Sequence, residues 1–178
     1  MLILWYNCYG IIIYIISKLF RGSSAVERLA VNQDVAGSNP APGAVTDCIF
    51  CKIIKRKEPA RIIYEDKDVI CFLPKTIHVY GHTLIVPKKH YESLYDIPEK
   101  DLIKLIKTAK KLTLAYKKKI KATGVNLLHA SGKDAQQSVF HFHFHLFPRF
   151  KNDNLDTWPK LPKIKVDPDE LLRKLKIM

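Results

Sequence analysis

The stretch HFHFHLF at residues 141–147 places a histidine at every second position, with an apolar residue after each one. Side chains at alternate positions of a β-strand share one face of the sheet. The pattern therefore predicts a strand that directs His141, His143 and His145 to one side. The opposite face, expected to lie in a core, carries Phe142, Phe144 and Leu146.

Three imidazoles in register, close in sequence to Gln137, Ser138 and Arg149, favour a functional site over a strand whose polar face merely uses histidine. Two uses remain open. Neutral imidazole is a common zinc ligand. An imidazole that titrates near neutral pH is also unprotonated often enough to attack phosphorus. The two uses can be divided among the three histidines.

Cys48 and Cys51 form a C-x-x-C pair in CIFC, which is half of the ligand set of a tetrahedral zinc site. The intervals from Cys51 to His90 and on to His141 are too long for a zinc finger. Ligands from separate elements would instead join the N-terminal segment to the sheet. The alternative is two small buried residues with no metal.

The 178-residue chain has a formal net charge of +13, with 47% hydrophobic and 26% charged residues. This length suits one domain with a sizeable core. A basic surface attracts phosphates and gives loose nucleic-acid binding without identifying a partner. The chain has four cysteines, too few for a disulfide framework, so a reducing compartment and a cytoplasmic location are expected.

Residues 1–44 differ from the rest of the chain. Residues 1–20 are almost continuously apolar, and about 20 such residues cross a bilayer. Residues 21–44 resemble the translation of a transfer-RNA gene, whose common T-arm sequence reads Gly-Ser-Asn-Pro, as at residues 37–40. We expect residues 1–44 to lie outside the native protein, which would begin at Val45; a genuine leader or anchor is the alternative. The segment has three basic and two acidic residues, so the remaining 134 residues keep a charge of +12.

From residue 47 the pattern predicts an α+β domain that ends near residue 150. Short β-branched runs predict strands at residues 62–65, 69–73, 82–87 and 125–130, in addition to the histidine strand. A long helix is expected after Pro98, with Asp96 and Glu99 as its capping pair. Its apolar face is expected at Leu102, Ile106, Ala109, Leu112, Tyr116 and Ile120. Residues 151–178 are expected to form an extended tail that ends in a short helix.

The same residues resemble the histidine triad (HIT) family. HFHFHLF fits its signature His-φ-His-φ-His-φ-φ, where φ is an apolar residue. The resemblance covers residues 47–150 and includes CIFCKII at 48–54, GHTLIVPKKH at 81–90 and SGKDAQQSVFHFHFHLFPR at 131–149. It implies an antiparallel sheet of about five strands with one long and one short helix. It also implies a twofold homodimer that cleaves a nucleoside monophosphate from phosphoramidates or dinucleoside polyphosphates.

The resemblance assigns a role to single residues. His143 is implied to be the nucleophile that forms a nucleotidyl-histidine intermediate, and His145 to contact the phosphate. Ser138 and Gln137 are implied to hydrogen-bond the phosphate and assist the leaving group, and His82 to support the triad. The zinc-containing branch implies a structural zinc ion without an organic cofactor, held by Cys48, Cys51, His90 and His141.

Three positions depart from the family pattern. Many members have an acidic residue that binds the ribose where this chain has Pro74, so the nucleoside preference, expected to be for purines, is open. Lys75, the next residue, is the remaining candidate for a substrate contact. Ala130 replaces a frequent asparagine, and Gln136 replaces a frequent glycine.

Two other hypotheses stand beside the enzyme. A nucleotide- or nucleic-acid-binding protein with weak catalysis would explain the charge of +12, and its binding would weaken steeply with salt. The lysine-rich helix surface is better explained as a solvated face. A membrane-tethered enzyme would depend on residues 1–20 alone, and without them no membrane partner is expected.

Overall fold

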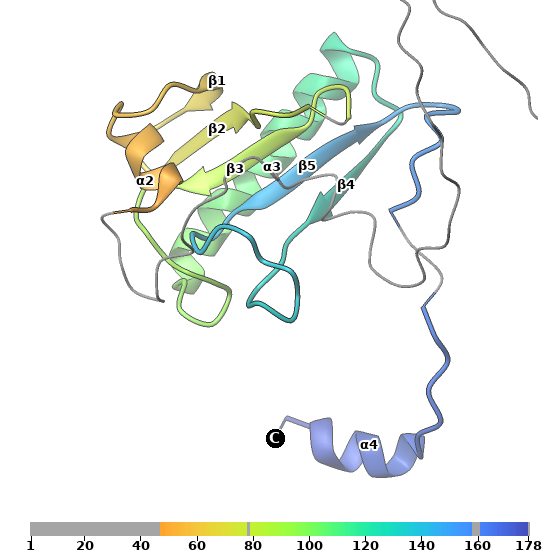
Figure 1. Cartoon of the computed structure of the whole chain (residues 1–178). Coiled ribbons are helices and arrows are strands. Elements are labelled where there is room, and N and C mark those ends of the chain that lie inside the picture. The colour runs from red at the N-terminus through yellow and green to blue at the C-terminus, as the bar shows by residue number, and fades with distance from the viewer. Residues whose placement is uncertain (1–46, 78, 158–160, 178) are drawn as a thin grey trace, which may run out of the picture.

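The computed structural model describes residues 47–77, 79–157 and 161–177. Five antiparallel strands form one sheet in the order β1-β2-β3-β5-β4 (Figure 1). This confirms the expected α+β fold. The strands are β1 (Arg61–Glu65), β2 (Val69–Leu73), β3 (Thr83–Pro87), β4 (Gly124–Leu128) and β5 (Phe144–Arg149). The helices are α2 (Ile49–Ile54), α3 (Glu99–Lys119) and α4 (Pro168–Leu175). The expectations for residues 1–44 lie outside the described residues.

The hairpin of β1 and β2 turns at residues 66–68, as the sequence predicts. Oδ1 of Asp66 accepts hydrogen bonds from the backbone N–H groups of Asp68 and Val69, both at 2.8 Å. A carboxylate that binds the backbone two and three residues on is a common way to close such a turn. The hairpin is one edge of the sheet, and the pairing of β1 is interrupted by a bulge between Ile62 and Tyr64.

Alternation along the strands divides the core into two layers. On one face, α3 packs over residues of β2, β3 and β5, including Phe144 and Leu146. On the other face, α2 packs over alternate residues of β2 and β3, including Phe72 and Leu84. Phe142, Phe144 and Leu146 all lie in the layer under α3, which confirms the side predicted for them. His145 therefore points to the opposite side of the sheet.

The long helix is confirmed, but two details of its prediction are wrong. Its N-cap is Pro98, and Asp96 does not cap it, because both Asp96 carboxylate oxygens accept backbone N–H groups of the preceding turn, from Glu92 and Ser93. The buried face includes Leu105 and Thr108 instead of Ile106, which is 46% exposed. The predicted Ala109 and Leu112 are buried, and Leu102 and Tyr116 pack against the core. The buried face is therefore the predicted one, rotated slightly toward Leu105.

The start of the C-terminal tail is held by hydrogen bonds from Arg149. Arg149 donates hydrogen bonds to Asp153, Thr157 and the carbonyl of Leu155. Helix α4 confirms the short helix expected at the end, with Asp167 as its N-cap, and it has no buried residues. Among the described residues, no helix is long and apolar enough to span a membrane.

Candidate metal centre and active site

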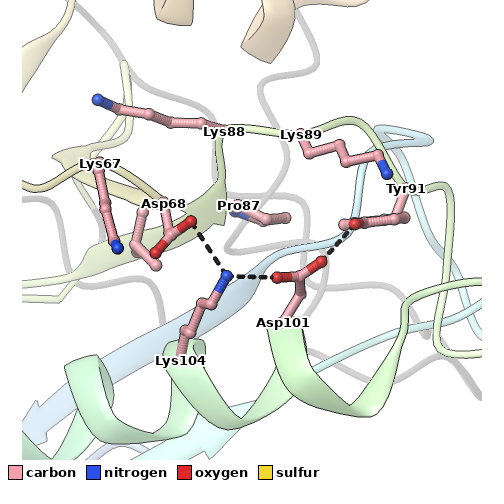
Figure 2. A pocket seen from close by; sticks show the side chains of 9 residues that line it. Lys67, Asp68, Pro87, Lys88, Lys89, Tyr91, Asp101 and Lys104 are labelled. Atoms are coloured by element: carbon pink, nitrogen blue, oxygen red, sulfur yellow. Dashed lines mark hydrogen bonds and ion pairs between the residues drawn. The ribbon is translucent and has the colours of Figure 1, made fainter.

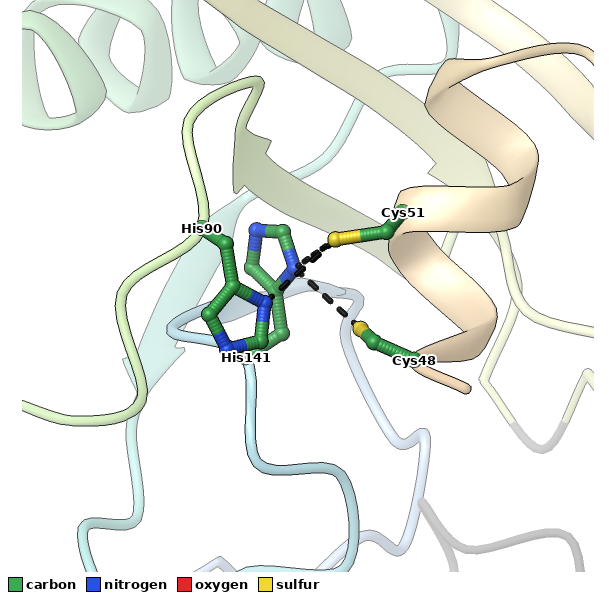
Figure 3. Close-up of side chains that lie close together, drawn as sticks. All are labelled: Cys48, Cys51, His90 and His141. Carbon is green, nitrogen blue, oxygen red and sulfur yellow. Dashed lines mark hydrogen bonds between the residues drawn. The ribbon is translucent and has the colours of Figure 1, made fainter. Parts of the chain in front are cut away.

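Four residues from three separate segments meet beside α2 (Figure 3). Cys48 and Cys51 come from the start of α2, His90 follows β3, and His141 precedes β5. One ligand atom from each residue lies within 4.8 Å of all the others. The Sγ atom of Cys51 is 3.3 Å from Nδ1 of His90, and Sγ of Cys48 is 3.4 Å from Nδ1 of His141. The four residues expected as ligands are therefore brought together.

The geometry fits a tetrahedral metal ion. Zinc bonds of 2.1 Å to nitrogen and 2.3 Å to sulfur place the two ligand atoms about 3.6 Å apart in a tetrahedron. The measured sulfur–nitrogen distances of 3.3, 3.4 and 3.6 Å lie close to that value. Nε2 of His141 donates to the carbonyl of Pro87 at 2.9 Å, so its Nδ1 is unprotonated and faces the sulfurs. Such a hydrogen bond typically orients a ligating histidine.

The thiol of Cys51 does not ionise readily in the absence of a cation. Burial, followed by the neighbouring Cys48, raises the pKa of Cys51 to about 12. Cys48, Cys51 and Cys71 are all free of disulfides. A bound cation would offset both causes, because metal coordination stabilises the thiolate. The donor set of two sulfurs and two imidazoles is typical of a structural zinc site.

His143 is the residue whose chemical state the structure defines best. Its Nδ1 lies 2.7 Å from the carbonyl oxygen of His141, which can only accept, so the ring proton is on Nδ1. Nε2 is therefore unprotonated and available as a nucleophile. Burial lowers the pKa of His143 to about 4, against an opposing effect of the His141 carbonyl. The ring also packs edge-on against Phe50, with centroids 5.1 Å apart. At neutral pH this imidazole is uncharged.

Only His145 lies within strand β5, so the prediction of one strand holding all three histidines is wrong. Strand β5 begins at Phe144, and residues 141–143 have no strand partner. Instead, the N–H of Phe142 donates to the carbonyl of Tyr91 at 2.6 Å. This bond keeps the segment extended, so the histidines still alternate with the phenylalanines.

His145 and His82 form a second imidazole pair next to His143. Nε2 of His82 and Nδ1 of His145 are 3.0 Å apart, so one ring donates to the other. The ring centroids of His143 and His145 lie 4.9 Å apart, with an angle of 65° between the ring planes. Burial, and then the neighbouring His143 and His82, hold the pKa of His145 well below its usual value. The predicted triad and its supporting histidine are thus in contact.

The loop before the triad places the other expected residues differently. The Gln137 amide is used by the backbone: Oε1 accepts from Gly132, and Nε2 donates to the carbonyls of Glu92 and Val139. Ser138, the next residue, is exposed, as is Lys75 after β2. In the described part of the chain, neither residue has a hydrogen bond or ion pair to the histidines. The phosphate contacts expected of these residues remain predictions.

His129 is a site residue that the sequence analysis missed. Its Nδ1 donates to the carbonyl of His143 at 2.8 Å, and its ring stacks on Phe142 with centroids 4.2 Å apart. Its Nε2 accepts from the hydroxyl of Ser131 at 2.6 Å, and that oxygen accepts from the N–H of Leu94. A single histidine at the end of a predicted strand has no pattern that marks it. The fold shows that the His129 ring makes the hydrogen bond to the carbonyl of His143 that a neighbouring strand would otherwise make.

Comparisons with known proteins agree with this geometry. The profile of the HIT domain matches residues 55–152. An uncharacterised HIT-like protein of Methanocaldococcus jannaschii is 43% identical over 130 residues, which cover 72% of this chain and 98% of that protein. The adenosine 5′-monophosphoramidase of Saccharomyces cerevisiae is 40% identical over 114 residues, covering 63% and 70% of the two chains.

Solved structures of other proteins share the fold of this chain. A zinc-bound histidine triad family protein from Mycobacterium smegmatis has a TM-score of 0.60 and 34% identity, over 62% of this chain and 80% of that one. The family profile, the similar sequences and the clustered histidines agree. This chain belongs to the histidine triad (HIT) family.

Proposed function

We propose that the protein is a nucleotidyl hydrolase that transfers a nucleoside monophosphate to His143 and then to water. The observation that supports this most directly is the buried, neutral imidazole of His143 with its proton fixed on Nδ1. The similarity to a yeast adenosine 5′-monophosphoramidase supports a phosphoramidate of a purine nucleoside as the substrate, and a dinucleoside polyphosphate is the second candidate.

In the first step, Nε2 of His143 attacks the α-phosphorus and the bond from phosphorus to the leaving group breaks. The ring gains positive charge as the P–N bond forms. The carbonyl of His141 accepts the Nδ1–H and stabilises that charge in a buried site. Water then attacks the same phosphorus, the bond to Nε2 breaks, and the monophosphate leaves. The proton that water loses balances the one that the leaving group takes up in the first step. His143 returns to its neutral form.

The remaining residues are proposed to bind and position the phosphate. The hydroxyl of Ser138 is exposed next to the triad loop and would donate to the phosphate or the leaving group. His145, oriented by His82, would donate to a phosphate oxygen. Gln137 would act chiefly by holding the loop through its three backbone hydrogen bonds. Lys75 would supply positive charge.

The metal centre is proposed to bind zinc through Cys48, Cys51, His90 and His141. When bound, the ion would neutralise the two thiolates and hold the three segments together. Its contribution to catalysis would be indirect, because the carbonyl of His141 fixes the proton of His143. The free thiols support a reducing compartment, and we propose a cytoplasmic location.

We also propose a homodimer joined through β4. This strand is an edge of the sheet, and Val125 and Leu127 on it are 39% and 37% exposed. An unprotected apolar edge strand readily pairs with another strand. Sedimentation should give twice the mass of the chain, and a monomer at micromolar concentration would contradict the dimer.

The test of function is hydrolysis of adenosine phosphoramidate and diadenosine polyphosphates by the purified protein. His143→Ala should abolish turnover, because no other group supplies the attacking nitrogen. Ser138→Ala should slow it by roughly 10²-fold, the usual effect of losing one donor to a transition-state oxygen. Full activity in the His143→Ala variant would refute the mechanism.

A further inference from the structure

A cleft lies on the face of the sheet that α3 covers. It has a volume of about 370 Å³ and opens between the start of β2, the end of β3 and the first turns of α3 (Figure 2). His145 points to the other side of the sheet, so this cleft is separate from the triad. Its lining contains four lysines: Lys67, Lys88, Lys89 and Lys104.

Lys104 pairs with both carboxylates of the cleft and offsets one of their two negative charges. The ammonium group of Lys104 lies 3.0 Å from Asp68 and 2.7 Å from Asp101, and the hydroxyl of Tyr91 donates to Asp101 at 2.5 Å (Figure 2). The hydrogen bonds from Lys104 and Tyr91 lower the pKa of Asp101, so it is ionised at neutral pH. Lys104 is therefore held by the two carboxylates that line the cleft and is not counted as a ligand contact.

The other three lysines form no ion pair with the two aspartates of the cleft. Lys88 forms an ion pair with Glu65 at 2.8 Å, but Glu65 is shared with Arg56. Lys89 lies 5.4 Å from the centre of the Tyr91 ring. Within the described residues, neither Lys67 nor Lys89 has a carboxylate within ion-pair distance.

We propose that this cleft binds a phosphate-bearing anion between Lys67, Lys88 and Lys89. Lysine is a compact point charge that commonly binds phosphate oxygens, and three such charges border the cleft. The ring of Tyr91 is 6% exposed and offers no platform for stacking a base. The recognised group is therefore the phosphate.

The cleft shares one chain segment with the metal centre. Lys88 and Lys89 lie between Pro87, whose carbonyl holds His141, and His90, whose Nδ1 faces Cys51. Tyr91 binds Phe142 through its carbonyl and Asp101 through its hydroxyl. The same contacts that assemble the triad thus fix the lysines of the cleft. Binding there does not depend on the proposed catalysis.

The test measures binding of inorganic tripolyphosphate to the full chain by calorimetry and by amide chemical shifts. The amides of Lys67, Lys88 and Lys89 should shift on addition. Replacing two lysines in the variant Lys67→Gln/Lys89→Gln should weaken binding about tenfold or more, because two charge-assisted contacts are lost. The matched control Lys117→Gln/Lys118→Gln removes the same charge at the far end of α3 and should leave affinity within about twofold.

A second arm uses a single-stranded oligonucleotide to distinguish a free phosphate compound from a nucleic-acid backbone. Tripolyphosphate bound more tightly identifies a small ligand, and the oligonucleotide bound more tightly identifies the polymer, provided that Lys67→Gln/Lys89→Gln weakens that binding. The proposal is overturned if neither probe binds, if the cleft variant binds as the wild type does, or if the control variant loses as much affinity.

Discussion

His143 has its proton on Nδ1 because the carbonyl of His141 can only accept a hydrogen bond. Burial keeps the ring neutral, with a pKa of about 4, so that Nε2 retains its lone pair throughout the physiological range. Residues 141–143 lack a strand partner, so the backbone carbonyl of Tyr91 and the side chain of His129 hold them instead. The reactivity of one residue therefore depends on hydrogen bonds made by its neighbours.

At this scale the clearest prediction concerns His129. His129→Ala leaves the buried carbonyl of His143 without its donor, which should cost about 1–3 kcal/mol of unfolding free energy. It should also lower kcat for nucleotide hydrolysis more than it changes KM, since the nucleophile is displaced and the substrate contacts remain. His129→Asn, which restores a donor, should recover part of both losses.

Urea denaturation and steady-state kinetics measure the two effects. An alanine variant with unchanged stability and unchanged kcat would show that the hydrogen bond to His143 has no positioning role.

Single residues were predictable where the sequence pattern repeats. The cysteine pair and the alternating histidines could be recognised because each set has a fixed spacing, whereas His90 was implied as a ligand only by the family resemblance. His129 has no such spacing. Gln136 adopts a positive φ of 65°, which explains why glycine suits that position, but nothing in its residue type reveals the conformation.

At the scale of elements, the candidate metal centre brings α2 together with the segments after β3 and before β5. We predict about one zinc ion per chain, measured by elemental mass spectrometry. Chelation should lower the unfolding free energy by at least about 3 kcal/mol, since a bound ion stabilises only the folded chain. Cys51→Ser should lose the metal, whereas Cys71→Ser should keep it because Cys71 lies outside the cluster.

Two results together would contradict this assignment. The purified protein would contain no metal and take up no added zinc, and its unfolding temperature would be unchanged by chelators.

Element types were predictable from the sequence, and element boundaries were less so. The hairpin at residues 66–68 and the long helix follow from turn residues and from a 3.6-residue period. The strand at the triad begins three residues later than its alternation suggests, because Tyr91 and His129 take the hydrogen bonds that a neighbouring strand would make. Long-range partners of this kind are invisible in a local pattern.

At the scale of the whole molecule, the buried histidines make folding sensitive to mild acid. Burial lowers the pKa of His129 and, more strongly, that of His145. In the unfolded chain both residues gain a proton near pH 6.5. The unfolded state then binds more protons, so the stabilisation is complete above about pH 6.5 and is lost as the pH falls toward the folded-state pKa values.

Each of these two groups contributes a slope of up to about 1.4 kcal/mol per pH unit in that window. Urea denaturation at pH 7.5, 6.5, 5.5 and 5.0 measures it, and His129→Asn should reduce the slope by its own share. A stability that does not change between pH 7 and pH 5 would show that these histidines titrate alike in both states.

The sheet also separates two candidate binding sites for anions, which the net charge of the chain alone does not distinguish. The triad and metal centre occupy one face, and the lysine-lined cleft occupies the face under α3. The net charge of +13 predicted anionic partners in general. The structure supports two distinct places for them.

Mass spectrometry of the protein during turnover of a slow adenosine phosphoramidate is the most direct test of the central claim. The reaction is stopped in alkali, which preserves a phosphorus–nitrogen bond to histidine, and peptides are sequenced. The account predicts one adenylyl group on His143, absent from the His143→Ala variant. Rapid hydrolysis with no adduct on this residue, or with the adenylyl group on another side chain, would contradict it.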